Sequence, residues 1–217
     1  MKKQLLLLIL LAILIPRSYV KADEGMWLPF MIDDALFSEM QEMGLNLTRD
    51  QIFSFTESSL KDAIVHFGGG CTAEIISDMG LVLTNHHCGY GRIQALSSVE
   101  NDLLTNGFWA DELGDELPSQ GLFVRFLVQA RDVTEEVAAA LSPDLTEEER
   151  GRIIREKSEE IVAAATDGTH YTANVRPMFA GNEFFLFVYE TYNDVRLVGT
   201  PPESIGSYGG DTDNWMW

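Results

Sequence analysis

The sequence is poor in basic residues. Its 217 residues include 15 Lys and Arg against 34 Asp and Glu, which gives a formal net charge of −19 at pH 7. A surface of this sign repels phosphate groups, so nucleic acids and anionic membrane surfaces are poor candidates for partners. The remaining composition is ordinary, with 46% hydrophobic, 10% aromatic and 23% charged residues. It excludes a chain that is disordered throughout and a fibrous repeat.

Long hydrophobic runs are scarce as well. The run from Leu5 to Ile15 has about 11 residues, whereas a helix needs about 20 to cross the hydrocarbon core of a bilayer. Two lysines precede the run, and Val20-Lys21-Ala22 supplies small residues at offsets suited to cleavage. This arrangement is typical of a secretory signal peptide. We therefore expect residues 1–22 to be removed and the mature chain to comprise residues 23–217.

Cysteine is limited to Cys71 and Cys88, both in the part expected to be exported. In an oxidising compartment such a pair most simply forms one disulfide. Closing the loop of about 18 residues stabilises the fold by ~3 kcal/mol in the chain-entropy model. The alternative is a metal site that adds His86 and His87. Adjacent residues on a strand point to opposite faces, which makes a shared metal unfavourable.

Short apolar stretches separated by turn residues predict an antiparallel β fold. Strands are expected at 72–76, 81–84, 122–128, 172–178, 184–189 and 195–198, with turns at 78–80 and 180–182. Helices are expected over Asp33 to Met43 and over Thr146 to Ala165, where Thr146 and Glu149 form a capping box. Many short strands with close turns indicate a barrel or a sandwich, in which the helices are insertions.

The stretch from Gly80 to Cys88, GLVLTNHHC, is the most informative about chemistry. It predicts a strand that delivers a histidine immediately before a cysteine, and a bond from Cys88 to Cys71 would hold that imidazole at the strand end. A general base that acts on a serine hydroxyl needs such a rigid support. The stretch resembles the Thr-x-x-His-Cys segment in the first barrel of chymotrypsin-like serine peptidases, which assigns the base to His87. The alternative is that both histidines are structural.

Seven motifs in order make the resemblance closer. They are 23–27 (DEGMW), 59–63 (SLKDA), 70–72 (GCT), 83–90 (LTNHHCGY), 106–110 (NGFWA), 194–199 (DVRLVG) and 211–215 (DTDNW). From Asp23 to Trp217 the chain resembles the bacterial dipeptidyl-peptidase 7 and dipeptidyl-peptidase 11 family, serine peptidase family 46. The resemblance implies a chymotrypsin-like antiparallel double β-barrel with a helical domain that caps the cleft. Residues 23–217 would then be the first barrel plus helices, truncated before the rest of the catalytic domain.

The resemblance also implies site residues. In that family the catalytic Asp lies in a Thr-Gly-Asp segment beyond the position of Trp217, and the nucleophilic Ser lies in a Gly-Asn-Ser-Gly-Ser segment near the far C-terminus. Neither segment occurs in this sequence, so the chain would carry only His87 of the triad. The family's Asn-Trp pair contributes to binding the substrate α-ammonium, which assigns Asn214 and Trp215 to that role. The alternative for these two residues is a glycine-rich loop with a core tryptophan.

These observations predict a serine-type dipeptidyl-peptidase that releases dipeptides from the N-terminus of peptides. The chain would be an N-terminal fragment of that enzyme, inactive by itself. Expected partners are peptides with a free N-terminus and, at full length, a second copy in a homodimer. No cofactor, metal, nucleic acid or membrane span after signal cleavage is expected, and the expected location is the periplasm or cell surface of a Gram-negative bacterium.

Two other functions remain compatible with the sequence. One is a secreted non-catalytic β-domain that binds peptides or proteins. The other is a metal-dependent hydrolase that uses His86, His87 and acidic residues. A Gly-Asn-Ser-Gly-Ser segment in the downstream coding sequence would distinguish the peptidase from the binding domain, and a metal analysis after dialysis would test the hydrolase.

Overall fold

The computed structural model describes residues 27–206, and the chain divides into two compact units, Met1–Leu45 and Asn46–Trp217. The signal peptide expected at 1–22 lies outside the described residues. The first unit contains η1 (Pro29–Met31) and α2 (Asp34–Glu42). The backbone N–H of Leu36 donates to the Asp33 carboxylate over 2.8 Å, and this contact caps the start of α2. The helix predicted over Asp33 to Met43 is confirmed.

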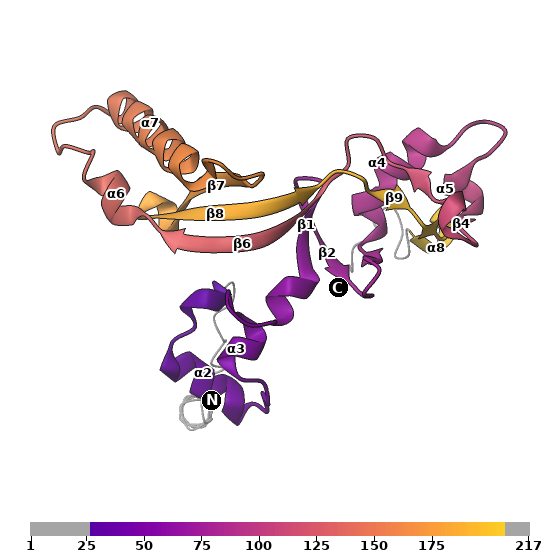
Figure 1. Cartoon of the computed structure of the whole chain (residues 1–217), viewed down its shortest axis with the longest axis horizontal. Coiled ribbons are helices and arrows are strands. Elements are labelled where there is room, and N and C mark those ends of the chain that lie inside the picture. Colours follow the sequence, from indigo (N-terminus) through magenta and orange to yellow (C-terminus); the bar gives the residue numbers. More distant parts are fainter. Residues whose placement is uncertain (1–26, 207–217) are drawn as a thin grey trace, which may run out of the picture. The chain divides into compact units, whose positions relative to one another are not determined.

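The second unit is built on a six-stranded antiparallel sheet in the order β3-β2-β1-β6-β8-β7. The long strands of this sheet run side by side in Figure 1. Its strands are β1 (Ile64–Phe67), β2 (Cys71–Ile75), β3 (Val82–Leu83), β6 (Val124–Asp132), β7 (Thr172–Met178) and β8 (Glu183–Tyr192). Because β3 and β7 do not pair with each other, the sheet does not close into a barrel within residues 27–206.

Smaller elements complete this unit. Among the described residues, β4 (Phe108–Trp109) pairs with β10 (Gly199–Thr200), and β5 (Leu117–Pro118) pairs with β9 (Arg196–Leu197). The helical segments are α3 (Arg49–Ile52), η2 (Leu60–Ala63), α4 (His86–Leu96), α5 (Leu103–Asn106), η3 (Leu113–Asp115), α6 (Thr134–Ala138), α7 (Glu147–Thr166), η4 (Phe179–Gly181) and α8 (Glu203–Gly206). The predicted class, mainly antiparallel β with helical insertions, is confirmed.

Two apolar clusters hold the second unit together. The first lies where α6 and α7 pack against β8, and consists of Val133, Val137, Ile161, Phe184, Leu186 and Val188. The second surrounds β1 and β2, and consists of Val65, Phe67, Ala73, Leu122 and Val124. Full burial of a Val, Leu, Ile or Phe side chain contributes about 1.5–3 kcal/mol. The two cysteines pack against the second cluster, so this core supports the region that carries the predicted chemistry.

The chain around the two adjacent histidines differs from the sequence prediction. A strand does not deliver them: β3 ends at Leu83, Asn85 is the N-cap residue, and His86 and His87 are the first two residues of α4. Helix α4 continues through residues with good helix propensity and buries Ile93. The first residues of the helix have low helix propensity, and burial of the Ile93 side chain compensates for it. This burial is a tertiary contact, so the local sequence does not predict it.

Candidate active site

A disulfide joins β2 to the first turn of α4. Cys71 is the first residue of β2 and Cys88 is the third residue of α4, and their Cα atoms lie 6.1 Å apart. The predicted pairing of these cysteines is therefore present. Both residues are half-buried against the cluster around β1 and β2. The N-terminal end of α4 is consequently fixed to the sheet by a covalent bond and by apolar packing.

His87 lies beside this disulfide. One of its ring nitrogens and the sulfurs of Cys71 and Cys88 all lie within 4.8 Å of one another. The His87 side chain is exposed, so it is accessible to a reacting group, as a general base must be. The two sulfurs are bonded to each other and offer no thiolate. These three side chains therefore do not provide the Cys and His ligands from which zinc sites are commonly built.

His86 has different surroundings. Successive residues of a helix are about 100° apart, so the two imidazoles diverge even though they do not lie on opposite faces of a strand. The half-buried His86 ring meets Tyr90 edge-to-face, with the ring centroids 5.8 Å apart. The ring also lies against Gly206 of α8, where an added Cβ would be 2.6 Å from Cγ of His86. Among the described residues, the buried Nε2 of His86 has no hydrogen-bond partner.

Tyr90 links α4 to α8 through its hydroxyl. That hydroxyl donates a hydrogen bond to Oε1 of Glu203 over 3.3 Å. The negative charge of Glu203 raises the pKa of Tyr90 above its ordinary value, with desolvation as the next cause. The phenol therefore stays protonated and remains a donor at neutral pH. His86, Tyr90, Glu203 and Gly206 together form what we call the α4–α8 contact.

Sequence reasoning found only part of this arrangement. It identified His87, Cys71 and Cys88, and the structure brings these three side chains together. Asn214 and Trp215, predicted to bind the substrate ammonium, lie outside the described residues, and their role stays a prediction. The α4–α8 contact was missed. The spacing of His86 and Tyr90 would have indicated that these two rings meet once the segment is read as a helix, since residues four apart share a helical face. It would not have indicated their contacts with α8.

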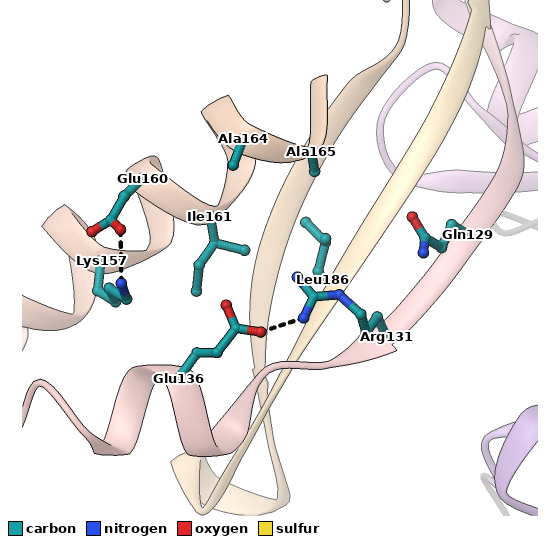
Figure 2. Close-up of a pocket in the computed structure, with 9 residues that line it drawn as sticks. All are labelled: Gln129, Arg131, Glu136, Lys157, Glu160, Ile161, Ala164, Ala165 and Leu186. Atoms are coloured by element: carbon teal, nitrogen blue, oxygen red, sulfur yellow. Dashed lines mark hydrogen bonds and ion pairs between the residues drawn. The ribbon is translucent and has the colours of Figure 1, made fainter. Parts of the chain in front are cut away.

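A surface pocket lies elsewhere in the second unit, between α7 and strands β6 and β8 (Figure 2). It has a volume of about 230 Å³, and the apolar side chains of Ile161 and Leu186 are among those that line it. Its charged side chains bind one another rather than facing the pocket as free charges; the ion pairs are Arg131–Glu136 and Lys157–Glu160. None of the predicted site residues lines this pocket, so the candidate active site remains the start of α4.

Within residues 27–206, we find no helix with both the length and the apolar character needed to cross a bilayer. The disulfide between Cys71 and Cys88 is a bond that oxidising compartments favour. That disulfide is compatible with an exported protein.

Comparison with known proteins gives matches along nearly the whole chain. The family model described as Peptidase S46 matches residues 22–217. Dipeptidyl-peptidase 7 of Capnocytophaga gingivalis is 46% identical over 217 residues, and the Asp/Glu-specific dipeptidyl-peptidase of the same organism is 47% identical over 193 residues. These alignments cover 100% and 89% of this chain but only 30% and 27% of the relatives. The chain thus spans less than a third of their length.

Solved structures agree with the sequence matches. Porphyromonas endodontalis DPP11 in complex with the dipeptide Arg-Asp has a TM-score of 0.80 and 39% sequence identity to this chain. The same protein in complex with the dipeptide Arg-Glu has a TM-score of 0.78 and 38% identity. Each comparison covers 90% of this chain and 29% of the solved chain. At 38% and 39% identity, the similarity extends to the sequence as well as to the general fold.

Proposed function

Because the chain belongs to the peptidase S46 family, we propose that it forms the N-terminal part of a serine-type dipeptidyl-peptidase that releases dipeptides from peptide N-termini. The observation that carries the proposal is His87, exposed beside the Cys71–Cys88 disulfide at the start of α4. Relatives that share 46% and 47% of their aligned residues with this chain are named as dipeptidyl-peptidases. Complexes of DPP11 with dipeptides support a peptide as the substrate class.

In this proposal His87 acts as general base and then as general acid. Its imidazole takes the proton of a serine hydroxyl as the oxygen attacks the scissile carbonyl carbon, and it later gives that proton to the leaving amine. The serine and the carboxylate that orients the imidazole come from sequence beyond Trp217. The disulfide and the apolar cluster hold the backbone of His87, which reduces the reorganisation needed when the proton moves.

Asn214 and Trp215 are proposed to bind the substrate's free N-terminus. An α-ammonium donates three hydrogen bonds, and an Asn side-chain carbonyl accepts them. The face of an indole attracts a cation as well. A fixed distance between this anchor and the nucleophile would select the second peptide bond for cleavage. These residues would then make the enzyme an exopeptidase that requires an unblocked substrate amine.

Export is the second part of the proposal. Residues 1–22 serve as the signal peptide, and the mature enzyme works in the periplasm or at the cell surface of a Gram-negative bacterium as a homodimer. The signal-like sequence and the disulfide support export. Cell fractionation tests the location, and size-exclusion chromatography with light scattering on the purified protein tests the dimer.

The central test uses the full-length protein, meaning this chain with its downstream coding sequence. We expect His87→Ala to lower kcat for fluorogenic dipeptide substrates by about 10⁴-fold or more, because removal of a triad base costs several orders of magnitude. His170→Ala is the matched control, since that histidine is 70% exposed and pairs with Glu190. It should retain normal activity. Full activity of the His87 variant would overturn the assignment of His87 as the base. A gene without a Gly-Asn-Ser-Gly-Ser segment would favour the non-catalytic binding domain instead.

A further inference from the structure

The first turn of α4 has two attachments to the rest of the unit, and His87 lies between them in the sequence. In one, Cys88 is bonded to Cys71 of β2. In the other, His86 and Tyr90 contact Gly206 and Glu203 of α8. A helix end that is fixed at only one attachment can still tilt about it. The α4–α8 contact opposes this tilt, and it therefore bears on where the imidazole of His87 points.

The His86 ring contributes to this contact through its volume. Its Nε2 is buried and makes no hydrogen bond to any of the described residues. The ring fills the space between Tyr90 and the backbone of Gly206 so closely that a Cβ at Gly206 would lie 2.6 Å from Cγ and 2.7 Å from Nε2. Contacts of that length require the ring to shift. An aromatic ring without the polar atom should therefore fill the same role, whereas a small side chain should not.

We infer that His86 is a positioning residue: its ring, wedged between Tyr90 and Gly206, sets the orientation of the first turn of α4 and with it the direction of the His87 imidazole. The inference rests on the proposed function, since it concerns the rate of a reaction in which His87 is the base. A displacement of about 1 Å at a reacting group lowers a rate by as much as about 100-fold. His86 itself touches neither the substrate nor the reacting atoms in this scheme.

The first experiment compares His86→Ala with His86→Phe in the full-length protein. We expect His86→Ala to lower kcat by about 10- to 100-fold while KM changes by less than about threefold, because only the placement of the base is affected. His86→Phe keeps the ring volume and should retain kcat within about threefold of the wild type. A Phe variant as impaired as the Ala variant would overturn the inference, because the polar atom rather than the ring volume would then matter.

Val137→Ala is the matched control for general loss of stability. Val137 is fully buried in the cluster beneath α7, outside the α4–α8 contact. Its truncation should lower the melting temperature by several degrees and leave kcat unchanged. If His86→Ala behaves in the same way, with a lower melting temperature and normal kcat, His86 is merely structural and the inference fails.

A double-mutant cycle tests the contact with Gly206 directly. Gly206 is not among the glycines with positive φ, so its backbone accepts an alanine. Gly206→Ala in the wild type should displace the His86 ring and lower kcat, whereas the same change in the His86→Ala background should cost little because the clashing ring is gone. Independent, multiplicative effects of the two changes would contradict the inference.

His87→Ala separates this inference from the proposed function. If His87→Ala abolishes turnover while His86→Ala keeps the wild-type kcat, the proposed function stands and the inference fails. If His87→Ala keeps full turnover, the role of His87 as base in the proposed function fails, whatever the His86 variants do.

Discussion

Gly107, between α5 and β4, is a position where the fold does not accommodate a side chain. Its φ is 76° and its ψ is 177°, a conformation essentially restricted to glycine that costs other residues roughly 1–3 kcal/mol. An added Cβ would lie 2.9 Å from the carbonyl oxygen of Thr200 and 2.9 Å from Cδ of Pro202. The residue therefore allows the end of α5 to approach the chain that follows β10.

Gly107→Ala should lower the free energy of unfolding of the expressed chain by about 2–4 kcal/mol, since backbone strain and a steric clash add. Urea denaturation followed by circular dichroism measures the change. Gly114→Ala is the control: its Cβ position has no atom within 4 Å, and its φ is not positive. That variant should stay within about 0.5 kcal/mol of the wild type. Equal stability of the two variants would show that the close approach at Gly107 is not rigid.

Among the helices, α7 begins at the capping box that its local sequence predicts. The hydroxyl of Thr146 accepts from the backbone N–H of Glu149 over 3.3 Å, and the Glu149 carboxylate accepts from the backbone N–H of Thr146 over 2.9 Å. The same carboxylate accepts a hydrogen bond from the Thr146 hydroxyl over 2.7 Å. These bonds, with the side-chain bond the largest cause, lower the pKa of Glu149 below its ordinary value.

The pH dependence of stability follows from that lowered pKa. The ionised carboxylate stabilises the folded state above the ordinary pKa of the unfolded chain, and this stabilisation is lost as the pH falls through the lower pKa of the folded state. Thr146→Ala removes the hydroxyl, so the loss of stability on acidification should become shallower, and the melting temperature at pH 7 should fall by a few degrees. Melting curves from pH 7 to pH 3 measure both, and Thr146→Ser should behave like the wild type. A Thr146→Ala curve parallel to that of the wild type would contradict the assignment.

Local signals account for which elements could be predicted. The capping box located α7, and short apolar stretches with turn residues located β2, β7 and β8, with β7 at the predicted residues 172–178. Helix α4 could not be found this way, because its first residues include two histidines, a cysteine and two glycines and carry no helical period. Its helical form depends on tertiary contacts: the disulfide to β2, the burial of Ile93 and the contact with α8.

For the whole molecule, the site also combines features that local sequence predicts with features that depend on tertiary contacts. Motifs around Thr84 and Cys88 were enough to predict the disulfide, which is present, and to assign the base to His87, which stays a prediction. The contact of His86 with Gly206 joins residues far apart in the chain, and no local pattern encodes it. The sequence predicted an antiparallel and incomplete barrel, and the sheet is antiparallel and open. The order of its strands could be determined only from the structure.

We expect residues 23–217 alone not to hydrolyse peptides. The rate of a serine peptidase comes from a Ser–His–Asp unit together with an oxyanion hole near the serine. This chain offers His87 and no Gly-Asn-Ser-Gly-Ser segment. The measurement is an assay of the purified fragment on fluorogenic dipeptide substrates, with and without a serine-directed phosphonylating inhibitor. Turnover that the inhibitor blocks would reveal a nucleophile within the chain, and turnover that it does not block would point to other chemistry.

The open sheet also bears on self-association. Within residues 27–206 its two edges are β3 and β7, and edge strands present backbone groups that invite pairing with strands of other molecules, the first step toward fibrils. β3 is only two residues long, which gives an incoming strand little to extend. β7 carries the charged Arg176 and then Pro177, whose nitrogen has no hydrogen to donate. The sheet thus interrupts strand-by-strand growth at both margins, and polymerisation through these edges is disfavoured even where the protein is concentrated.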